Sequence, residues 1–362
     1  MFHVVGPGTS NMGHVQRAWD HFRAVGSPRF LCAPMVDASE LAFRLLVRRY
    51  GVQLAYTPML HSLNFLQSPK YRDEHFTTCA LDRPVVAQFC GNDPTTLVAA
   101  AKLVESQVDA VDLNLGCPQN IARRGRYGAF LQDDWDLVQR LVSALSTHCS
   151  VPVWCKIRVF PDEHKTLAYA KLIQDAGCSV LAVHGRTRDQ KGNDPGPANW
   201  TMIRRIKEHL EIPVLMNGNI QSWADVQRGL AETRCDGVLA ADRLLAYPAL
   251  FSGREDNCIY ALAREYLGIV EQYDPQTPAR MIRGHLFRML NADIRRDEDL
   301  RERLLGAHSV QGFAEAVLIA QRRAAEMPVV AAPLERVHGL GGSSRVDVSR
   351  GASQPQTYAR PV

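Results

Sequence analysis

Apolar, strand-like segments and amphipathic, helix-like segments alternate without interruption over about 220 residues of this chain. The strand-like segments are Phe30–Ala33, Gln53–Thr57, Val85–Phe89, Val108–Leu113, Val153–Ile157, Val180–Val183, Val214–Met216 and Gly237–Ala240. The helix-like segments between them include Leu41–Tyr50, Thr95–Val104, Trp135–Leu145, Leu167–Asp175, Trp200–Leu210 and Trp223–Leu230. This alternation is typical of a parallel β/α protein, and eight strands are the number that closes a (β/α)8 TIM barrel. A doubly wound open sheet is the competing fold.

Polar residues follow the strand-like segments on one side only, the side of their carboxyl ends. With the residues beside them, the eight strand ends carry Pro34-Met35, Thr57-Pro58-Met59, Gln88, Asn114 with Cys117, Lys156 with Arg158, His184 with Arg186, Asn217-Gly218-Asn219 and Ala241-Asp242-Arg243. In a closed barrel these positions converge on one mouth, whereas in an open sheet they would be spread along an edge. The distribution therefore favours the TIM barrel.

The periodicity divides the chain into four regions. Residues 1–28 form a lead with a short helical pattern from His14 to Val25, which we expect on the outside of the main domain. Residues 29–253 form the barrel, and residues 254–323 have helical periodicity typical of a small C-terminal helical domain. Residues 324–362 are rich in Pro, Gly and Ser, which predicts a disordered tail.

Composition indicates an ordinary globular protein, with 46% hydrophobic and 22% charged residues and a formal net charge of +4. The mild basicity permits a nucleic-acid partner without requiring one. Nine cysteines with no CxxC spacing predict a reducing compartment, with neither a zinc site nor a disulfide framework. No segment is long and apolar enough to predict a membrane span, and the first twelve residues do not form a signal peptide. We therefore expect an enzyme of the cytoplasm or the nucleus, monomeric and without a metal.

The segment from Asp112 to Pro118 places two reactive side chains where a buried strand ends. Gly116 and Pro118 stop the strand, so Asn114 and Cys117 lie at its carboxyl end. A thiol there can donate a proton, and an amide can fix a planar substrate through hydrogen bonds. An isolated cysteine is more often a small buried apolar residue, so this interpretation depends on its neighbours.

The last two strand-like segments are followed by small residues. Loops at these positions of a barrel bind phosphate through backbone N–H groups, and Gly218 with Asn219 and Ala241 with Asp242 suit that role. A phosphate-bearing cofactor is therefore expected. Lys156 and His184 could stabilise negative charge at the N1/O2 edge of a flavin, and Gln88 could pair with its pyrimidine edge. Alternatively, Lys156 could form an ion pair with Asp112, and His184 could be an ordinary buried histidine.

Taken in order, these residues resemble the tRNA-dihydrouridine synthases. The resemblance covers about residues 29–251 and rests on Ala33-Pro34-Met35, Thr57-Pro58-Met59, Gln88-Phe89-Cys90-Gly91, the segment Asp112 to Pro118, Lys156-Ile157-Arg158, His184-Gly185-Arg186 and Asn217-Gly218-Asn219. Other motifs are most similar to the eukaryotic branch that acts on positions 16 and 17 of the tRNA D-loop. These are Ala122-Arg123-Arg124-Gly125, Tyr127-Gly128, Asp134-Trp135 and Gln190-Lys191-Gly192.

The resemblance implies an FMN-bound barrel that takes a hydride from NADPH and reduces the C5–C6 double bond of a tRNA uridine. It implies that Cys117 is the proton donor to C5 and that Asn114 orients the uracil or the flavin. The implied FMN contacts are Pro34, Met35, Val36, Gln88, Lys156, His184, Asn217, Gly218, Asn219, Ala241 and Asp242. Asp242 stands where the family often has a small residue, so its side chain should point away from a phosphate.

Arginines are the expected contacts to the tRNA. The helical region carries Arg280, Arg283, Arg288, Arg295, Arg296, Arg301 and Arg303 among several acids, a pattern that also fits an ion-paired surface. The resemblance favours contact with the tRNA backbone. Arg123, Arg124 and Arg126, in the loop after the catalytic turn, are expected to hold phosphates beside a base turned out of its stack, and Arg186 is also assigned to the substrate.

Two other functions are compatible with parts of the pattern. A dihydroorotate or dihydropyrimidine dehydrogenase is also an FMN barrel acting on the same bond of a free pyrimidine, but those enzymes place Ser before the cysteine, where this chain has Gly116. A non-catalytic RNA-binding protein on the same barrel has no need to keep Asn114, Cys117, Lys156 and His184 together. The chain has neither a GxGxxG motif nor a P-loop.

Overall fold

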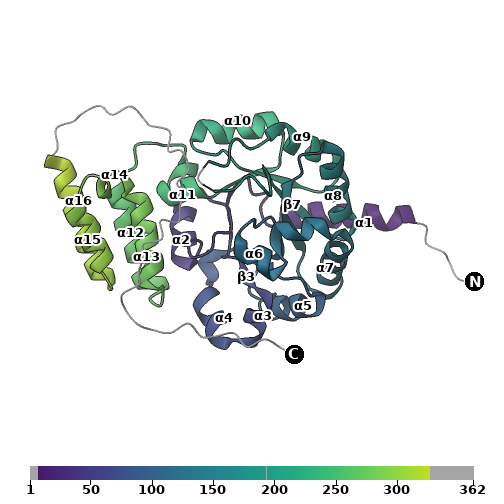
Figure 1. Cartoon of the computed structure of the whole chain (residues 1–362), viewed down its shortest axis with the longest axis horizontal. Helices are drawn as coiled ribbons and strands as arrows, with labels where there is room; N and C mark the ends of the chain where they lie inside the picture. Colours follow the sequence, from purple (N-terminus) through teal and green to yellow (C-terminus); the bar gives the residue numbers. More distant parts are fainter. Residues whose placement is uncertain (1–6, 193, 327–362) are drawn as a thin grey trace, which may run out of the picture.

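A computed structural model of the chain describes residues 7–192 and 194–326. In it, eight parallel strands close into a ring, because β1 pairs with both β2 and β9, and β2 pairs with β4. Helices surround this ring (Figure 1). The (β/α)8 TIM barrel predicted from the sequence is confirmed, and the open sheet is wrong.

All eight predicted strands form, with shifts of at most four residues at their ends. The strands are β1 Phe30–Cys32, β2 Leu54–Tyr56, β3 Leu60–His61, β4 Val85–Cys90, β5 Ala110–Leu115, β6 Val153–Val159, β7 Val180–Thr187, β8 Val214–Asn217 and β9 Gly237–Ala240. The additional strand, β3, pairs only with the end of β4. Its two residues are too few to give a periodic signal.

The helices predicted between the strands form as well, and most of these follow a residue whose side chain caps the first turn. The described residues contain sixteen α-helices in all. They are α1 Pro7–Ala24, α2 Leu41–Arg49, α3 Ser62–Gln67, α4 Pro69–His75, α5 Pro94–Lys102, α6 Asn120–Gly125, α7 Trp135–His148, α8 Glu163–Asp175, α9 Trp200–His209, α10 Trp223–Thr233, α11 Asp242–Ala246, α12 Ile259–Tyr273, α13 Ala279–Met289, α14 Asn291–Ile294, α15 Glu298–Gly306 and α16 Val310–Glu326. Short 3-10 helices are η1 Ala80–Asp82, η2 Gly128–Asp133 and η3 Leu250–Ser252. The side chains of Asp93, Asp134 and Asp162 each accept a backbone N–H in the first turn of the helix that follows, which satisfies a donor that the helix itself cannot.

Strand alternation sorts the side chains into two cores. Residues such as Val111, Leu113 and Cys155 point outward and pack against the helices in the larger core. Their neighbours Ala110 and Trp154 point into the barrel, where they join Leu31, Leu54, Tyr56, Val86, Val180, Ala182, Leu215 and Leu239 in a second, closed cluster. Polar residues that lie an even number of positions after these inward-pointing residues must also point inward, nearer the carboxyl ends of the strands.

Helix α1 closes the amino-terminal end of the barrel. Phe22 belongs to the inner cluster, and the indole Nε1–H of Trp154 donates to the imidazole Nε2 of His21 at 3.2 Å. Trp19 packs against the same cluster and donates to the carbonyl oxygen of Glu211. The expectation that this lead lies on the outside was incomplete, because a 3.6-residue period indicates an apolar face but not what that face covers.

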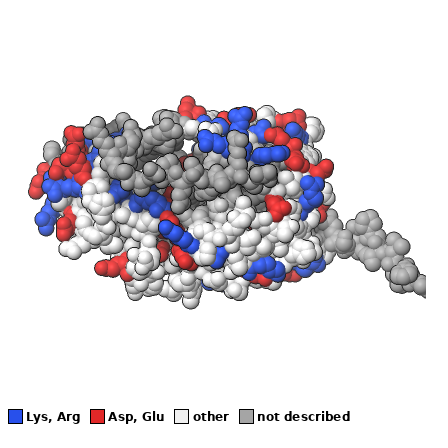
Figure 2. Space-filling model, turned by 60° about the horizontal axis from the view of Figure 1, so that its bottom comes forward, with Lys and Arg blue, Asp and Glu red and all other residues white. Residues whose placement is uncertain are grey.

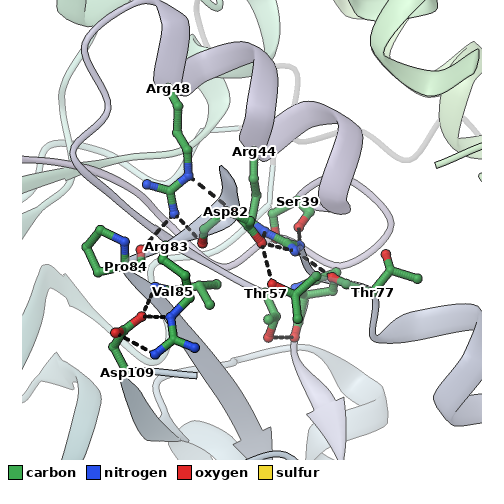
Figure 3. Close-up of polar contacts among 12 residues, drawn as sticks. Ser39, Arg44, Arg48, Thr57, Thr77, Asp82, Arg83, Pro84, Val85 and Asp109 are labelled. Carbon is green, nitrogen blue, oxygen red and sulfur yellow. Dashed lines mark hydrogen bonds and ion pairs between the residues drawn. The ribbon is translucent and has the colours of Figure 1, made fainter. Parts of the chain in front are cut away.

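A buried ion-pair cluster holds α2 against the segment before β4 (Figure 3). Arg44 donates to Oδ2 of Asp82 from Nε at 3.0 Å and from Nη2 at 2.6 Å, and Arg48 donates to Oδ1 at 3.3 Å. Arg44 also donates to the carbonyl oxygens of Ser39 and Thr77. The carboxylate of Asp82 thus binds the guanidinium groups of Arg44 and Arg48. Through Arg44 it also connects α2 to the backbone at Ser39 and Thr77.

Helices α12–α16 form a group at one side of the barrel, beside α2 and α11 (Figure 1). At this junction, Glu40 accepts a hydrogen bond from Tyr266 at 2.8 Å and pairs with Nε2 of His285 at 3.0 Å. All three are buried. Helix α16 ends at Glu326, so residues 324–326, assigned to the tail by sequence, are helical. The rest of the predicted tail lies outside the described residues.

Candidate active site

A layer of polar side chains lies inside the barrel, above the apolar cluster. Side chains an even number of residues apart on a strand point to the same side. Gln88 therefore points inward like Val86, Asn114 like Ala110, and Lys156 like Trp154. His184 on β7 and Asn217 on β8 continue the same layer. Strand register aligns Gln88 with Asp112, Asn114 with Lys156, and His184 with Asn217. The barrel therefore brings the strand-end residues predicted from the sequence to one place.

The turn after β5 is shaped by Asn114. Its Oδ1 accepts hydrogen bonds from the backbone N–H groups of Gly116 at 3.1 Å and Cys117 at 2.9 Å. Gly128 packs against the same turn, where a β-carbon would lie 2.7 Å from the Cys117 carbonyl oxygen. Its φ of +65° also favours glycine. The backbone of Cys117 is thus fixed by the hydrogen bond to Asn114 on one side and by the packing of Gly128 on the other.

Cys117 is the half-buried thiol at this turn, and burial raises its pKa above the usual value. A backbone N–H and the cations of Arg158 and Lys156 lower it by less, so the thiol stays protonated near neutral pH. Cys90, the competing cysteine at the neighbouring strand end, is fully buried and its pKa is also raised by burial. Cys117 is therefore better placed to donate a proton.

Lys156 and His184 form the cationic side of the layer. Burial is the main factor that lowers the pKa of Lys156 to about 8, and Arg158 adds to it. Within the described residues the ammonium has no hydrogen bond or ion pair, so the alternative of an ion pair with Asp112 is not observed. Burial also lowers the pKa of His184 well below its usual value, which keeps the ring neutral. The layer thus offers one ammonium group and one neutral imidazole.

Arg158 connects the turn after β5, which carries Cys117, to the loop after β7. It donates from Nε to the carbonyl oxygen of Gly116 at 2.9 Å, and from Nη1 to those of Thr187 and Gln190 at 2.8 and 2.9 Å. Burial lowers its pKa to about 10, and Arg186 adds to the effect. Sequence reasoning placed Arg158 at a strand end but gave it no role. Its position two residues after Lys156, on the same face of β6, was the available signal.

The loop after β8 adopts a conformation that needs a glycine. Gly218 has a φ of +111°, and a β-carbon there would lie 2.8 Å from Cβ of Ala198 and 3.0 Å from Cδ2 of His184. Asn219 has a φ of +61°. Asn217 donates from Nδ2 to the carbonyl oxygen of Leu239 at 2.9 Å, which ties the two strand ends together.

Arg186 lies at this end of the layer. It donates from Nη2 to Oδ1 of Asn219 at 2.7 Å and from Nε to the carbonyl oxygen of Gly196 at 2.8 Å, and its Nη1 lies 3.3 Å from Nε2 of His184. Ala241 precedes α11, and the side chain of Asp242 is exposed. Arg186 is therefore grouped with the small-residue loops and not with the arginines of α6.

The remaining predicted residues lie at the rim. Pro34 and Met35 are half-buried in the loop after β1, where the Met35 N–H donates to Oγ of Ser39, and Val36 is 61% exposed. The three arginines of α6 and its C-terminal cap, Arg123, Arg124 and Arg126, are all exposed. They belong to a surface beside Cys117 and not to the polar layer.

Residues 31–325 match the family model described as dihydrouridine synthase (Dus). The chain belongs to the dihydrouridine synthase family. This confirms the family resemblance seen in the sequence.

Curated members of the dihydrouridine synthase family are similar over most of the chain. A rat protein named tRNA-dihydrouridine(16/17) synthase-like is 48% identical over 294 residues, covering 81% of this chain and 66% of that protein. The budding yeast tRNA-dihydrouridine(16/17) synthase is 44% identical, covering 78% of this chain and 70% of that protein. A human tRNA-dihydrouridine(20a/20b) synthase-like protein is 37% identical, covering 74% and 84%. The chain spans slightly less than two thirds of the length of the rat relative.

Two absences hold for the described part of this dihydrouridine synthase family member. Residues 7–192 and 194–326 contain no cluster of three or more His, Cys, Asp or Glu side chains able to hold a metal ion. No helix in these ranges has both the length and the apolar character needed to cross a membrane.

Proposed function

We propose that this chain is an FMN-dependent tRNA-dihydrouridine synthase that reduces the C5–C6 double bond of a D-loop uridine, with NADPH as the electron source. The observation that supports it best is the neutral, half-buried thiol of Cys117, held one strand away from the unpaired ammonium group of Lys156. Higher identity to the 16/17 enzymes than to the 20a/20b protein favours position 16 or 17.

The residues present fit an anionic, phosphate-bearing flavin. The phosphate end would lie at Asn217, Gly218, Asn219, Ala241 and Asp242, where backbone N–H groups can approach closely because Gly218 has no β-carbon. Asp242 would contribute through its backbone, because its side chain is exposed.

Arg186 would complete the phosphate end. Its guanidinium bonds Asn219 and lies beside His184, so it is better placed for a phosphate of the cofactor than for the substrate role expected from the sequence.

The ring of the flavin would lie across the polar layer. Pro34, Met35 and Val36 would contact it from the loop after β1, and Lys156 and His184 from the strand ends. Gln88, expected from the sequence to pair with the ring, has no exposed surface and bonds Asn114 and Asp112, so it would support the site from below. When bound, FMN supplies the hydride that reaches C6 of the uracil. Lys156 would stabilise negative charge at the ring edge as an ammonium group, and His184 as a neutral hydrogen-bonding partner.

Cys117 would act as general acid. Its thiol proton moves to C5 of the uracil, and because burial keeps the thiol protonated at neutral pH, the proton is available when it is needed. Asn114 would orient the base with the N–H of its side-chain amide that is not bonded to Gln88, because its oxygen is already committed to the turn.

Exposed arginines would hold the RNA on two surfaces. Arg123, Arg124 and Arg126 lie beside the mouth, where they would hold phosphates on either side of a base turned out of its stack.

The helical region would contribute fewer arginine contacts to the RNA than its number of arginines suggested. Arg280 pairs with Glu74, Arg303 with Asp299, and Arg283 is bonded to backbone carbonyl groups. Four other arginines of this region are exposed and pair with no acid within the described residues; they are Arg288, Arg295, Arg296 and Arg301. Basic and acidic side chains lie beside one another at this end of the molecule (Figure 2), so attraction to phosphate would be local.

The test uses the full chain in two steps. The purified protein should show a flavin spectrum, and anaerobic addition of NADPH should bleach it. Unmodified tRNA should then restore the spectrum and acquire dihydrouridine at position 16 or 17, as detected by mass spectrometry of nuclease fragments.

Two results of that test would contradict the proposal. Restoration by free uracil or orotate but not by tRNA would favour a dehydrogenase of free pyrimidines. A protein that binds tRNA but takes up no FMN would favour a non-catalytic RNA-binding role. We further propose that the protein works as a monomer, without a metal, in the cytoplasm or the nucleus, where its nine cysteines would stay reduced.

A further inference from the structure

A chain of side-chain hydrogen bonds runs through the interior of the barrel below the catalytic turn. Asn114 donates from Nδ2 to Oε1 of Gln88 at 2.8 Å, and Gln88 donates from Nε2 to Oδ2 of Asp112 at 2.9 Å. At its upper end, Oδ1 of Asn114 accepts the backbone N–H groups of Gly116 and Cys117. Asp112 and Gln88 have no exposed surface. The chain links the turn that carries Cys117 to a carboxyl group shielded from solvent.

Groups at both ends of this chain set the direction of its bonds. Each amide can present either its oxygen or its NH2 group, whereas the backbone N–H groups at the upper end only donate and an ionised carboxylate at the lower end only accepts. The oxygen of Asn114 therefore faces the turn and its NH2 group faces Gln88, while the NH2 group of Gln88 faces Asp112. The carboxylate of Asp112 excludes the opposite arrangement from below.

Stability alone does not account for a carboxyl group at position 112. It forms no ion pair within the described residues, and its Oδ1 has no hydrogen-bond partner there. The hydroxyl of Tyr56 also lacks one. Burial raises the pKa of Asp112 to about 7, while the bond from Gln88 and the charge of Lys156 oppose the shift. Since an unpaired buried charge is costly, an apolar residue would be more stabilising here.

We propose that Asp112 is a positioning residue for Cys117, which acts by fixing the orientations of Gln88 and Asn114 and thereby the shape of the catalytic turn. The proposal deepens the proposed function, because the benefit of a well-placed thiol rests on its role as proton donor. The geometry itself does not depend on that function and can be tested without flavin or tRNA.

Three variants separate orientation from simple loss of a side chain. Asp112→Asn keeps the size of the side chain but can present its NH2 group, so the two amides above lose the obligate acceptor that orients them from below. Gln88→Glu alone places two carboxyl groups in contact, so it should also disturb the chain. When the two substitutions are combined, the new amide on β5 can donate to the new carboxylate on β4, which accepts from Asn114 as the wild-type Gln88 does. The double variant moves the obligate acceptor one place along the chain and should restore the turn.

The readout is the reactivity of the Cys117 thiol in the folded protein at pH 8. Iodoacetamide is added, and alkylation at Cys117 and Cys258 is followed by mass spectrometry of peptides. Cys258 is exposed and precedes α12, outside the barrel strands, so it serves as an internal reference. Circular dichroism and urea unfolding report whether each variant is folded.

We expect the Cys117 to Cys258 ratio to change by about threefold or more in each single variant and to return to within about twofold of wild type in the double variant, because the pair is coupled. An unchanged ratio in Asp112→Asn, or a double variant that departs from wild type as far as the singles combined, would overturn the proposal. If Asp112→Asn fails to fold, a folded double variant with wild-type reactivity still supports it, and a double variant that also fails to fold overturns it. Absence of flavin or dihydrouridine would count against the proposed function alone.

Discussion

The Nε–H of Arg158 donates a hydrogen bond of 2.9 Å to the carbonyl oxygen of Gly116, the residue immediately before Cys117. The same guanidinium group bonds the carbonyl oxygens of Thr187 and Gln190 in the loop after β7. The turn that carries Cys117 is therefore held from inside by Asn114 and from the side by Arg158.

Replacing Arg158 with lysine should keep the charge but lose this set of three bonds, because an ammonium group lacks the planar fork of guanidinium. Loss of charge-assisted bonds worth about 1.5–3 kcal/mol predicts roughly 10- to 100-fold slower reoxidation of the reduced flavin by tRNA. Stopped-flow absorbance measures the rate. Arg188→Lys is the matched control, since Arg188 pairs with Asp133 at a partly exposed site. Equal losses of reoxidation rate in the two variants would show that the three bonds of Arg158 do not account for the effect.

Cys117→Ala should separate the two half-reactions. Reduction of the flavin by NADPH needs no thiol and should keep its rate, whereas reoxidation by tRNA should slow by about 10²–10⁴-fold, the usual effect of removing a general acid. Cys90→Ala is the control, because Cys90 is fully buried beside it. If the loss appeared in Cys90→Ala instead, the proton donor would lie at the end of β4.

Lys156 should make stability depend on pH in the cofactor-free protein. Its pKa is lowered from 10.5 to about 8 on folding. Between these values the unfolded chain binds more protons than the folded one, so the free energy of unfolding should rise with pH through this window. Urea unfolding at several pH values measures it. The rise should be smaller in Lys156→Met, and identical curves for the two proteins would mean that the ammonium group is not desolvated.

Asp82→Asn should destabilise the protein strongly. Arg44 and Asp82 are both buried, so removing the carboxylate charge leaves guanidinium groups without compensation (Figure 3), which typically costs about 3–5 kcal/mol. Urea unfolding again provides the measurement. Glu208→Gln, which removes exposed ion pairs with Arg204 and Arg205, should change stability little. Similar losses of unfolding free energy in the two variants would show that a buried ion pair matters no more here than an exposed one.

Neutralising Arg295 and Arg296 together should weaken tRNA binding and reduce the slope of log affinity against log salt by up to about two, since each phosphate contact contributes about one. Filter binding over a range of salt concentrations measures the slope. Arg303→Gln with Arg323→Gln is the comparison, because both of these arginines already pair with acids. A larger effect in the comparison variant would place the RNA on the ion-paired face.

The sequence predicted the barrel and much of the candidate site because both follow from local patterns. Lys156 and His184 end apolar strands, so a count of strands was enough to bring them together. The bonds from Arg158 to Gly116 and from Gln88 to Asp112 join neighbouring strands, and they depend on register, which a strand pattern alone does not fix. The pairing of Arg186 with Asn219 escaped prediction for the same reason.

The apolar cluster that fills the barrel, with Phe22 of α1 at its far end, has a kinetic consequence for the proposed function. A flavin bound at the polar layer would be approached only from the mouth of the barrel. A nicotinamide and a uracil that both have to reach the same flavin face from that side could not occupy it together. The oxidised nucleotide would leave before the RNA base enters, and double-reciprocal plots at several fixed tRNA concentrations would give parallel lines, the signature of a ping-pong reaction order.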